Sequence, residues 1–219
     1  MHMSKSVLLT RPEHDVVTKY LCAWSEEVVS LARSKGMKVC DLRGRKAKKS
    51  EFDSYMRANQ PALFFMNGHG SASVITGHDN EVLVDSRTQL KDGIIYARSC
   101  DAGHVLGHQL INNGAKVFIG YRRKFICGYM PERATRPLQD PIACLFLAPS
   151  NLVVSTLIKG NTADEAHIRS RKEMYKNFRR MISSAGSSEE KYAARWLWNN
   201  ISNQVLLGNA QGKVQVGGL

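Results

Sequence analysis

The sequence predicts an α/β fold in which a mostly parallel β-sheet of about six strands carries helices on both faces. Short apolar runs alternate with longer segments whose apolar residues recur every three or four positions, a pattern typical of strands joined by helices. Some runs are apolar throughout, as expected for strands covered on both faces. The chain has 219 residues, 43% of them hydrophobic, so we expect one domain spanning residues 1–219.

The first half of the chain predicts three strands and two helices. Pro12 suits the first turn of a helix, and an apolar stripe from Val17 to Leu31 predicts one long helix that stops at Gly36. A second helix is expected over residues 50–60, before Pro61. The predicted strands of this half are residues 6–10, 38–42 and 62–66.

The second half continues the alternation and then becomes mainly helical. Thr162 and Glu165 have the spacing of a capping box, which predicts that a helix begins at Thr162. The predicted strands are residues 93–97, 116–120 and 205–208, and the predicted helices are residues 104–113, 138–147, 162–181 and 188–201.

The charge of the chain favours anionic partners. Lysine and arginine number 31 against 19 aspartates and glutamates, which gives a formal net charge of +12. Basic residues cluster at positions 43–49 and 169–180. Such clusters are more often solvated faces than binding sites, so nucleic acid is expected only as an indirect partner.

The N-terminal segment and the cysteines indicate the cytoplasm. The apolar run from Val7 to Leu9 is too short for a signal peptide or a membrane span, so neither secretion nor a membrane partner is expected. Five cysteines are an odd number, without the spacing of a disulfide framework or a metal clip. We therefore expect free thiols in a reducing compartment, and no cofactor.

Two predicted strands end in segments that differ from ordinary connections. His69 lies between Gly68 and Gly70 after one strand, and Cys100 follows Ser99 after the next. The carboxyl ends of parallel strands open onto one edge of a sheet, which predicts that the imidazole and the thiol meet. A following helix N-terminus would lower the pKa of the Cys100 thiol. A thiol beside an imidazole can perform nucleophilic catalysis.

These two segments resemble those of the caspase-like cysteine peptidases of clan CD, which include caspases, gingipains, separase and the bacterial CHAT proteases. The resemblance rests on an apolar strand ending in Asn67–Gly70 and a later one ending in residues 98–100. Further features similar to the bacterial CHAT and gingipain-like branch are Gly107, Gly114, residues 119–121 and the closing segment 206–209. The interval from His69 to Cys100 is shorter than the about 50 residues of caspases, which predicts a trimmed loop.

The resemblance implies a caspase-like fold and a cysteine endopeptidase that acts on a protein substrate. Cys100 would attack a peptide carbonyl and His69 would give a proton to the leaving amine. The backbone N–H groups of Gly70 and Cys100 would hold the oxyanion. Removing one such donor typically lowers the rate of an enzyme about 10²- to 10³-fold. The sequence identifies no third member of the catalytic group.

Substrate preference and regulation are also expectations from the resemblance. Ser99 and Asp101 are candidate substrate-binding residues, and Asp101 and Asp140 as acidic pocket floors favour Arg or Lys before the scissile bond. Enzymes of this kind are commonly held inactive until a partner protein or ligand orders their loops, and residues 122–141 are the expected regulated segment. A prokaryotic defence or cell-death system would suit such an enzyme.

Two alternatives compete with this interpretation. His104 and His108 lie four positions apart and near Cys100. Histidine and cysteine are common zinc ligands, but no clear fourth ligand is present, so no metal is expected there. A catalytically silent caspase-like module could instead bind a polyanion or nucleic acid through its basic surface.

Overall fold

The computed structural model describes residues 4–214 and confirms the predicted α/β class. Its central sheet has six strands in the order β2-β1-β3-β6-β7-β8, parallel except for β8, which runs antiparallel to β7. The strands of this sheet are β1 (Ser4–Arg11), β2 (Lys38–Arg43), β3 (Pro61–Asn67), β6 (Ile94–Arg98), β7 (Val117–Tyr121) and β8 (Gln204–Gly208). The helices are α1 (Val16–Trp24), α2 (Glu26–Ser34), α3 (Lys49–Ala58), α4 (Leu106–Asn112), α5 (Pro141–Ile158), α6 (Ala163–Met181) and α7 (Ser188–Asn203).

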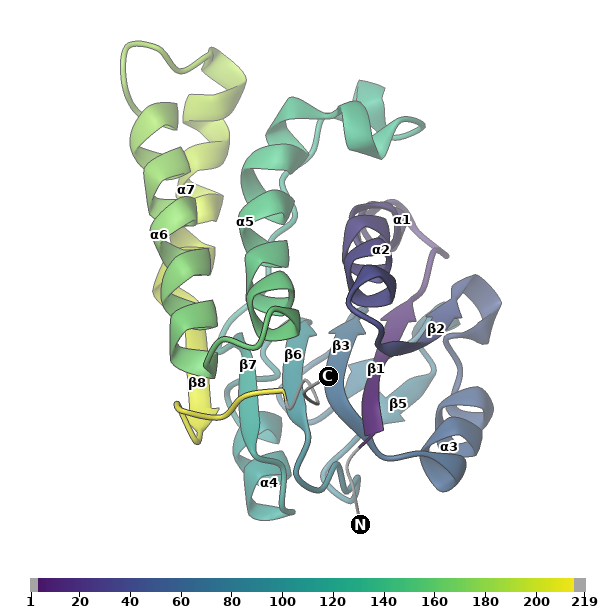
Figure 1. The fold of residues 1–219 in the computed structure, drawn as a ribbon. Helices are drawn as coiled ribbons and strands as arrows, with labels where there is room; N and C mark the ends of the chain where they lie inside the picture. The colour runs from purple at the N-terminus through teal and green to yellow at the C-terminus, as the bar shows by residue number, and fades with distance from the viewer. Residues whose placement is uncertain (1–3, 215–219) are drawn as a thin grey trace.

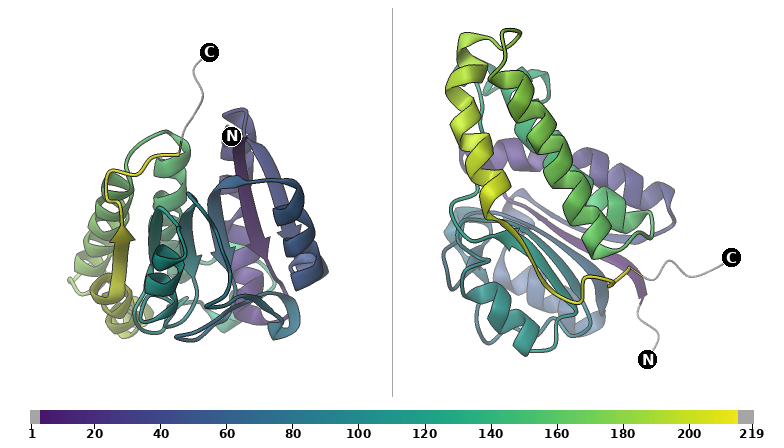
Figure 2. Two further views of the ribbon diagram at one scale, coloured as in Figure 1. Left: turned by 90° about the horizontal axis from the view of Figure 1, so that it is seen from below. Right: turned by 90° about the vertical axis from the view of Figure 1, so that its left-hand side faces the viewer.

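Helices cover both faces of the sheet, as predicted (Figure 1). Alternate residues of β3 point to opposite faces: Leu63 and Phe65 belong to one core cluster, and Phe64 and Met66 to the other. The first cluster packs against α1, α2, α5, α6 and α7, and the second packs against α3 and α4. Figure 2 shows these helix layers on either side of the sheet. Every residue of β3 is therefore buried, which explains why residues 62–66 are all apolar.

The helical segment after β1 differs from the prediction in two ways. It is two helices with a break at Ser25, and the first begins only at Val16, so Pro12 lies in a loop and not in a helical turn. Asp15 caps α1 because its side chain accepts a hydrogen bond from the Thr18 N–H. The Thr18 hydroxyl oxygen in turn accepts a hydrogen bond from the Asp15 N–H. The expectation of one long helix starting at Pro12 was therefore wrong, and the residues between β1 and α1 form a loop instead.

Helix α5 is longer than the predicted 138–147, because it continues through Pro149 to Ile158. A proline inside a helix leaves the carbonyl four residues earlier without its partner. Here that carbonyl belongs to Leu145, and it accepts a hydrogen bond of 3.0 Å from Asn177 of α6. Among the described residues α5 alone is long and apolar enough to cross a membrane, yet 72% of it is buried inside the fold, as is usual for a core helix.

A small hairpin, which the sequence analysis missed, fills the connection between β3 and β6. It consists of β4 (Ile75–Thr76) and β5 (Val82–Val84), paired antiparallel. Short 3₁₀ helices complete the described chain at Gly44–Lys46, His78–Asn80, Pro131–Arg133 and Pro137–Gln139. The hairpin keeps this connection compact, consistent with the short interval between His69 and Cys100.

Candidate active site

The sheet register brings the two predicted catalytic segments to one edge. Asn67 of β3 pairs with Arg98 of β6, so His69 and Cys100 follow at equivalent positions beyond the paired residues. The Ser99 hydroxyl donates a hydrogen bond of 2.9 Å to the His69 carbonyl and joins the two segments directly. Ser99 is 1% exposed, so we assign it this structural role and not contact with a substrate.

The glycines beside His69 are required by close packing. Gly68 has a φ of +155°, and a Cβ there would lie 2.0 Å from the Thr76 carbonyl oxygen. A Cβ on Gly70 would lie 2.0 Å from the Ser99 hydroxyl oxygen. Any side chain at either position would displace the loop that carries His69.

Asp15 is a candidate functional residue that the sequence analysis missed. Its Oδ2 lies 2.5 Å from His69 Nε2, while its Oδ1 accepts the Thr18 N–H at 2.8 Å. Because a carboxylate can only accept, Nε2 carries the proton, and Nδ1 of a neutral ring is left as the acceptor. Burial acts to raise the pKa of Asp15, but the hydrogen bonds from Thr18 and His69 outweigh it and lower that pKa to about 2. The Asp-x-x-Thr spacing after β1 is the signal that could have indicated this residue.

The surroundings of Cys100 raise the pKa of its thiol. Burial, the largest influence, raises its pKa, and Asp101 adds to the effect, against the lowering influence of the Phe125 backbone and Lys124. The expected lowering by a helix dipole was wrong, because α4 begins only at Leu106 and such an effect falls off within one turn. Within the described chain, the thiol donates its weak hydrogen bond of 3.8 Å to the Phe125 carbonyl and not to His69.

The two predicted oxyanion donors are not used by the loops around them. In the described part of the chain, neither Gly70 nor Cys100 donates its N–H to a backbone carbonyl of the turns and loops.

The segment after β7 covers the Cys100 loop and is tied to α7. The Arg123 carbonyl accepts a hydrogen bond of 3.2 Å from the Asp101 N–H. The Asn200 side chain bonds both backbone groups of Ile126, at 2.9 and 2.7 Å. Asn199 donates to the Lys124 carbonyl at 2.8 Å. The segment that lies over the thiol is therefore held by side chains of a single helix.

A cavity of about 860 Å³ lies beside this loop, and its charge is mainly positive. Asp101 lines it together with Arg122, Arg123 and Lys124. Asp140, the other proposed acidic floor, does not: it is 1% exposed and caps α5, accepting bonds from Tyr20 and two backbone N–H groups. The expectation for Asp140 was wrong, and three cations against one carboxylate favour an anionic group in the cavity.

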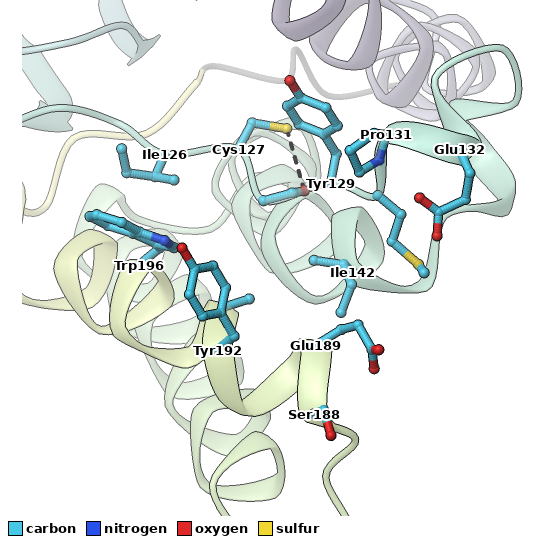
Figure 3. Close-up of a pocket in the computed structure, with 13 residues that line it drawn as sticks. Ile126, Cys127, Tyr129, Pro131, Glu132, Ile142, Ser188, Glu189, Tyr192 and Trp196 are labelled. Atoms are coloured by element: carbon cyan, nitrogen blue, oxygen red, sulfur yellow. Dashed lines mark hydrogen bonds between the residues drawn. The ribbon is translucent and has the colours of Figure 1, made fainter.

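A second, apolar cavity of about 620 Å³ adjoins the first (Figure 3). The two share Ile126 and Trp196 as lining residues. Tyr129 approaches from the loop and Tyr192 from α7, as Figure 3 shows. A chain bound along both cavities would meet positive charge near Cys100 and apolar surface farther away.

The geometry does not support the alternative zinc site at Cys100, His104 and His108. His104 precedes α4 and so does not share a helix face with His108. Among the described residues, the one group of histidine, cysteine or acidic side chains close enough to share a metal ion is His14, Asp15 and His69.

No protein-family model matches the chain, and no curated protein matches it. Any function assigned to it therefore depends on the chemistry of these side chains.

Proposed function

We propose that this chain is a caspase-like cysteine endopeptidase in which Cys100 is the nucleophile, His69 the acid/base and Asp15 the group that orients His69. The observation that carries the proposal is the bond between Asp15 and His69 Nε2 at the strand edge shared with Cys100. It leaves Nδ1 of His69 free to exchange a proton with a thiol or an amine. A third group that orients the base is the recurring feature of activated nucleophiles.

In the proposed reaction the Cys100 sulfur gives its proton to His69 and attacks the carbonyl carbon of a peptide bond, forming a carbon–sulfur bond. The N–H groups of Gly70 and Cys100 receive the oxyanion. His69 passes the proton to the leaving amine as the carbon–nitrogen bond breaks. Water, deprotonated by His69, then hydrolyses the thioester and restores the thiol.

The thiol's environment supports control of this reaction by a partner protein or ligand. In the present arrangement Cys100 is bonded to the Phe125 carbonyl and its pKa is raised, so little thiolate is available. A shift of residues 122–126 would free the thiol. We expect the enzyme to work in a reducing compartment such as the cytoplasm, where the five free cysteines of the described chain remain thiols.

The proposal is tested with purified protein and a peptide library that contains acidic, basic and apolar residues at each position. We expect cleavage beside acidic residues, because Arg122, Arg123 and Lys124 line the adjacent cavity. A peptidyl electrophile of the same sequence should modify Cys100, as located by mass spectrometry, and should not modify the exposed Cys144. Cleavage beside Arg or Lys would overturn the acidic preference, and modification at Cys144 alone would overturn the assignment of the nucleophile.

Asp15→Asn should reduce kcat by about 10²-fold while the protein stays folded. Asparagine caps a helix as well as aspartate does, so α1 is retained, but the amide lacks the charge that holds the protonated Nε2. Asp15→Ala, the companion variant, should in addition lose about 1 kcal/mol of stability with the cap. Kinetics and chemical denaturation of both proteins are the measurements, and wild-type kcat in Asp15→Asn would contradict the orienting role.

The same carboxylate gives a signed pH dependence. The pKa of Asp15 is about 2 in the folded protein, below its value in an unfolded chain. Its stabilising contribution is therefore complete above the unfolded pKa and is lost as the pH falls through the folded pKa. Between these two pKa values, the free energy of unfolding of Asp15→Asn should fall less steeply with decreasing pH than that of the wild-type protein, as measured by acid unfolding.

The second candidate function, a silent module that binds a polyanion, is favoured by the exposed side of α6. Six basic side chains are exposed there: Arg169, Arg171, Lys172, Lys176, Arg179 and Arg180. Salt-sensitive binding of nucleic acid, together with no electrophile labelling of Cys100, would favour this function over peptidase activity.

A further inference from the structure

His14 occupies an unusual position in the loop before α1. Its side chain is 11% exposed, and neither ring nitrogen has a hydrogen-bond partner within the described residues. Its ring lies 5.8 Å from the ring of His69 and 5.2 Å from that of His78, measured between centroids. A neutral imidazole offers one donor and one acceptor, and burying both unpaired is unfavourable. The ring thus has binding capacity that the surrounding chain does not use.

The ligand atoms of His14, Asp15 and His69 converge on one point. All lie within 4.8 Å of one another. His14 Nε2 is 3.7 Å from Asp15 Oδ2, and His69 Nε2 is 2.5 Å from the same oxygen. Tetrahedral zinc, with bonds of about 2.0–2.1 Å, keeps its ligand atoms roughly 3.3 Å apart. The first of these separations needs to shrink and the second to widen, each by less than about 1 Å. The third, between the two imidazole nitrogens, is at most 4.8 Å and needs to shrink by no more than about 1.5 Å. Rotation of the side chains can supply these shifts.

The local backbone favours this convergence. His14 and Asp15 are consecutive residues of the short loop between β1 and α1, and Thr18 fixes the Asp15 carboxylate through Oδ1. Oδ2 is left to face the two imidazoles. Two histidines and one carboxylate, with water in the fourth position, form a ligand set that zinc commonly takes in sites with an open position.

We propose that His14, Asp15 and His69 form a Zn²⁺ site. Zinc bound there takes the lone pair of His69 Nε2, the Nε2 proton is exchanged through solvent for one on Nδ1, and the metal replaces the hydrogen bond between His69 and Asp15. The ring is then held by the metal with Nδ1 protonated, and it no longer accepts a proton from Cys100. Zinc occupancy and catalysis exclude one another, so the metal is a reversible inhibitor. The inhibition rests on the proposed function, whereas the metal site does not.

The site is tested by calorimetric titration of Zn²⁺ into the metal-free Cys100→Ala protein. We expect one high-affinity ion per chain, with affinity reduced at least tenfold in His14→Ala and in His14→Gln, which preserves polarity and approximate size; loss of even an outer-shell group typically costs about 10- to 100-fold. His108→Ala, which removes an exposed histidine of α4, is the matched control and should bind like its parent. Unchanged affinity in both His14 variants, or no saturable binding to the parent, would overturn the site.

Cobalt identifies the ligand type. Co²⁺ in the same protein should give visible d–d bands without the near-ultraviolet charge-transfer band of a thiolate ligand, because the proposed ligands are nitrogen and oxygen atoms. A thiolate band that persists in His14→Ala would assign the metal to a cysteine and overturn the proposal. These measurements use a protein without the nucleophile, so failure of the peptidase assignment does not affect their meaning.

The inhibitory consequence is measured separately in the wild-type protein. Zinc should reduce peptide cleavage and a chelator should restore it. His14→Ala should need at least about tenfold more zinc than the wild-type protein for the same fractional inhibition of its own zinc-free rate. Zinc that binds through His14 and leaves cleavage unchanged would overturn the inhibition while the site remains.

Discussion

Peptide cleavage by the Cys100→Ala protein is expected to fall about 10⁴- to 10⁶-fold, and His69→Ala should lose a similar factor. The two residues act as one unit, because the thiol is a weak nucleophile until the imidazole removes its proton. The double variant should therefore be no slower than either single variant, rather than showing the product of both losses. Initial rates over a range of substrate concentrations, measured for all four proteins, check this.

One cysteine variant and one serine variant serve as controls for this prediction. Cys144→Ser removes an exposed thiol and should leave the rate unchanged. Ser99→Ala removes the hydrogen bond to the His69 carbonyl and should slow cleavage far less than loss of Cys100. Substantial cleavage by Cys100→Ala, or a double variant much slower than both singles, would show that these side chains are not a catalytic pair.

Arg98→Met is expected to lower the free energy of unfolding by about 3–5 kcal/mol, comparable to leaving two buried acceptors unpaired at about 1–3 kcal/mol each. Arg98 is fully buried two residues before Cys100. Its guanidinium donates to Asn67 at 2.6 Å, to Asn151 at 2.9 Å and to Ser25 at 2.6 Å. It thereby joins β3, the break between α1 and α2, and α5.

The cost of losing Arg98 comes from the acceptors that would remain. Methionine fills much of the same space but leaves the side-chain oxygens of Asn67 and Asn151 without that donor, and buried unpaired acceptors are costly. Lysine cannot reproduce the planar fork, so Arg98→Lys should recover little of the stability. Arg123→Ala, at an exposed arginine nearby, should change stability by less than about 0.5 kcal/mol.

Denaturant unfolding monitored by circular dichroism measures the effect of Arg98→Met. A loss of this size corresponds to a fall in Tm of roughly 10 °C for a chain of this length. A loss below about 1 kcal/mol would mean that the neighbouring polar groups find other partners, and that Arg98 does not organise the strand end before Cys100.

The placement of His69 and Cys100 at equivalent positions beyond two paired strands could be predicted from the sequence. The strands that precede them are short and almost entirely apolar, which indicates parallel strands covered on both faces, and such strands end at a common edge. The glycines beside His69 were also informative, because only glycine permits the close approach to Thr76 and Ser99.

Asp15 and the environment of the thiol could not be predicted in this way. The bond from Asp15 to His69 spans 54 positions, and it exists because the chain after β1 remains a loop as far as Asp15 instead of entering a helix at Pro12. The contact of Cys100 with Phe125 spans 25 positions and depends on how α7 holds that segment. A helix N-terminus was expected to lower the pKa of the Cys100 thiol, and burial in the folded chain raises that pKa.

The sequence by itself determined the alternation of strands and helices and the two segments that follow β3 and β6, because periodicity, apolar runs and glycine positions are properties of neighbouring residues. The tertiary structure alone decided that Asp15 contacts His69, that Asp140 caps a helix inside the core, and that a basic segment covers Cys100. Those contacts join residues far apart in the chain, and their formation depends on the packing of the whole domain rather than on any local pattern.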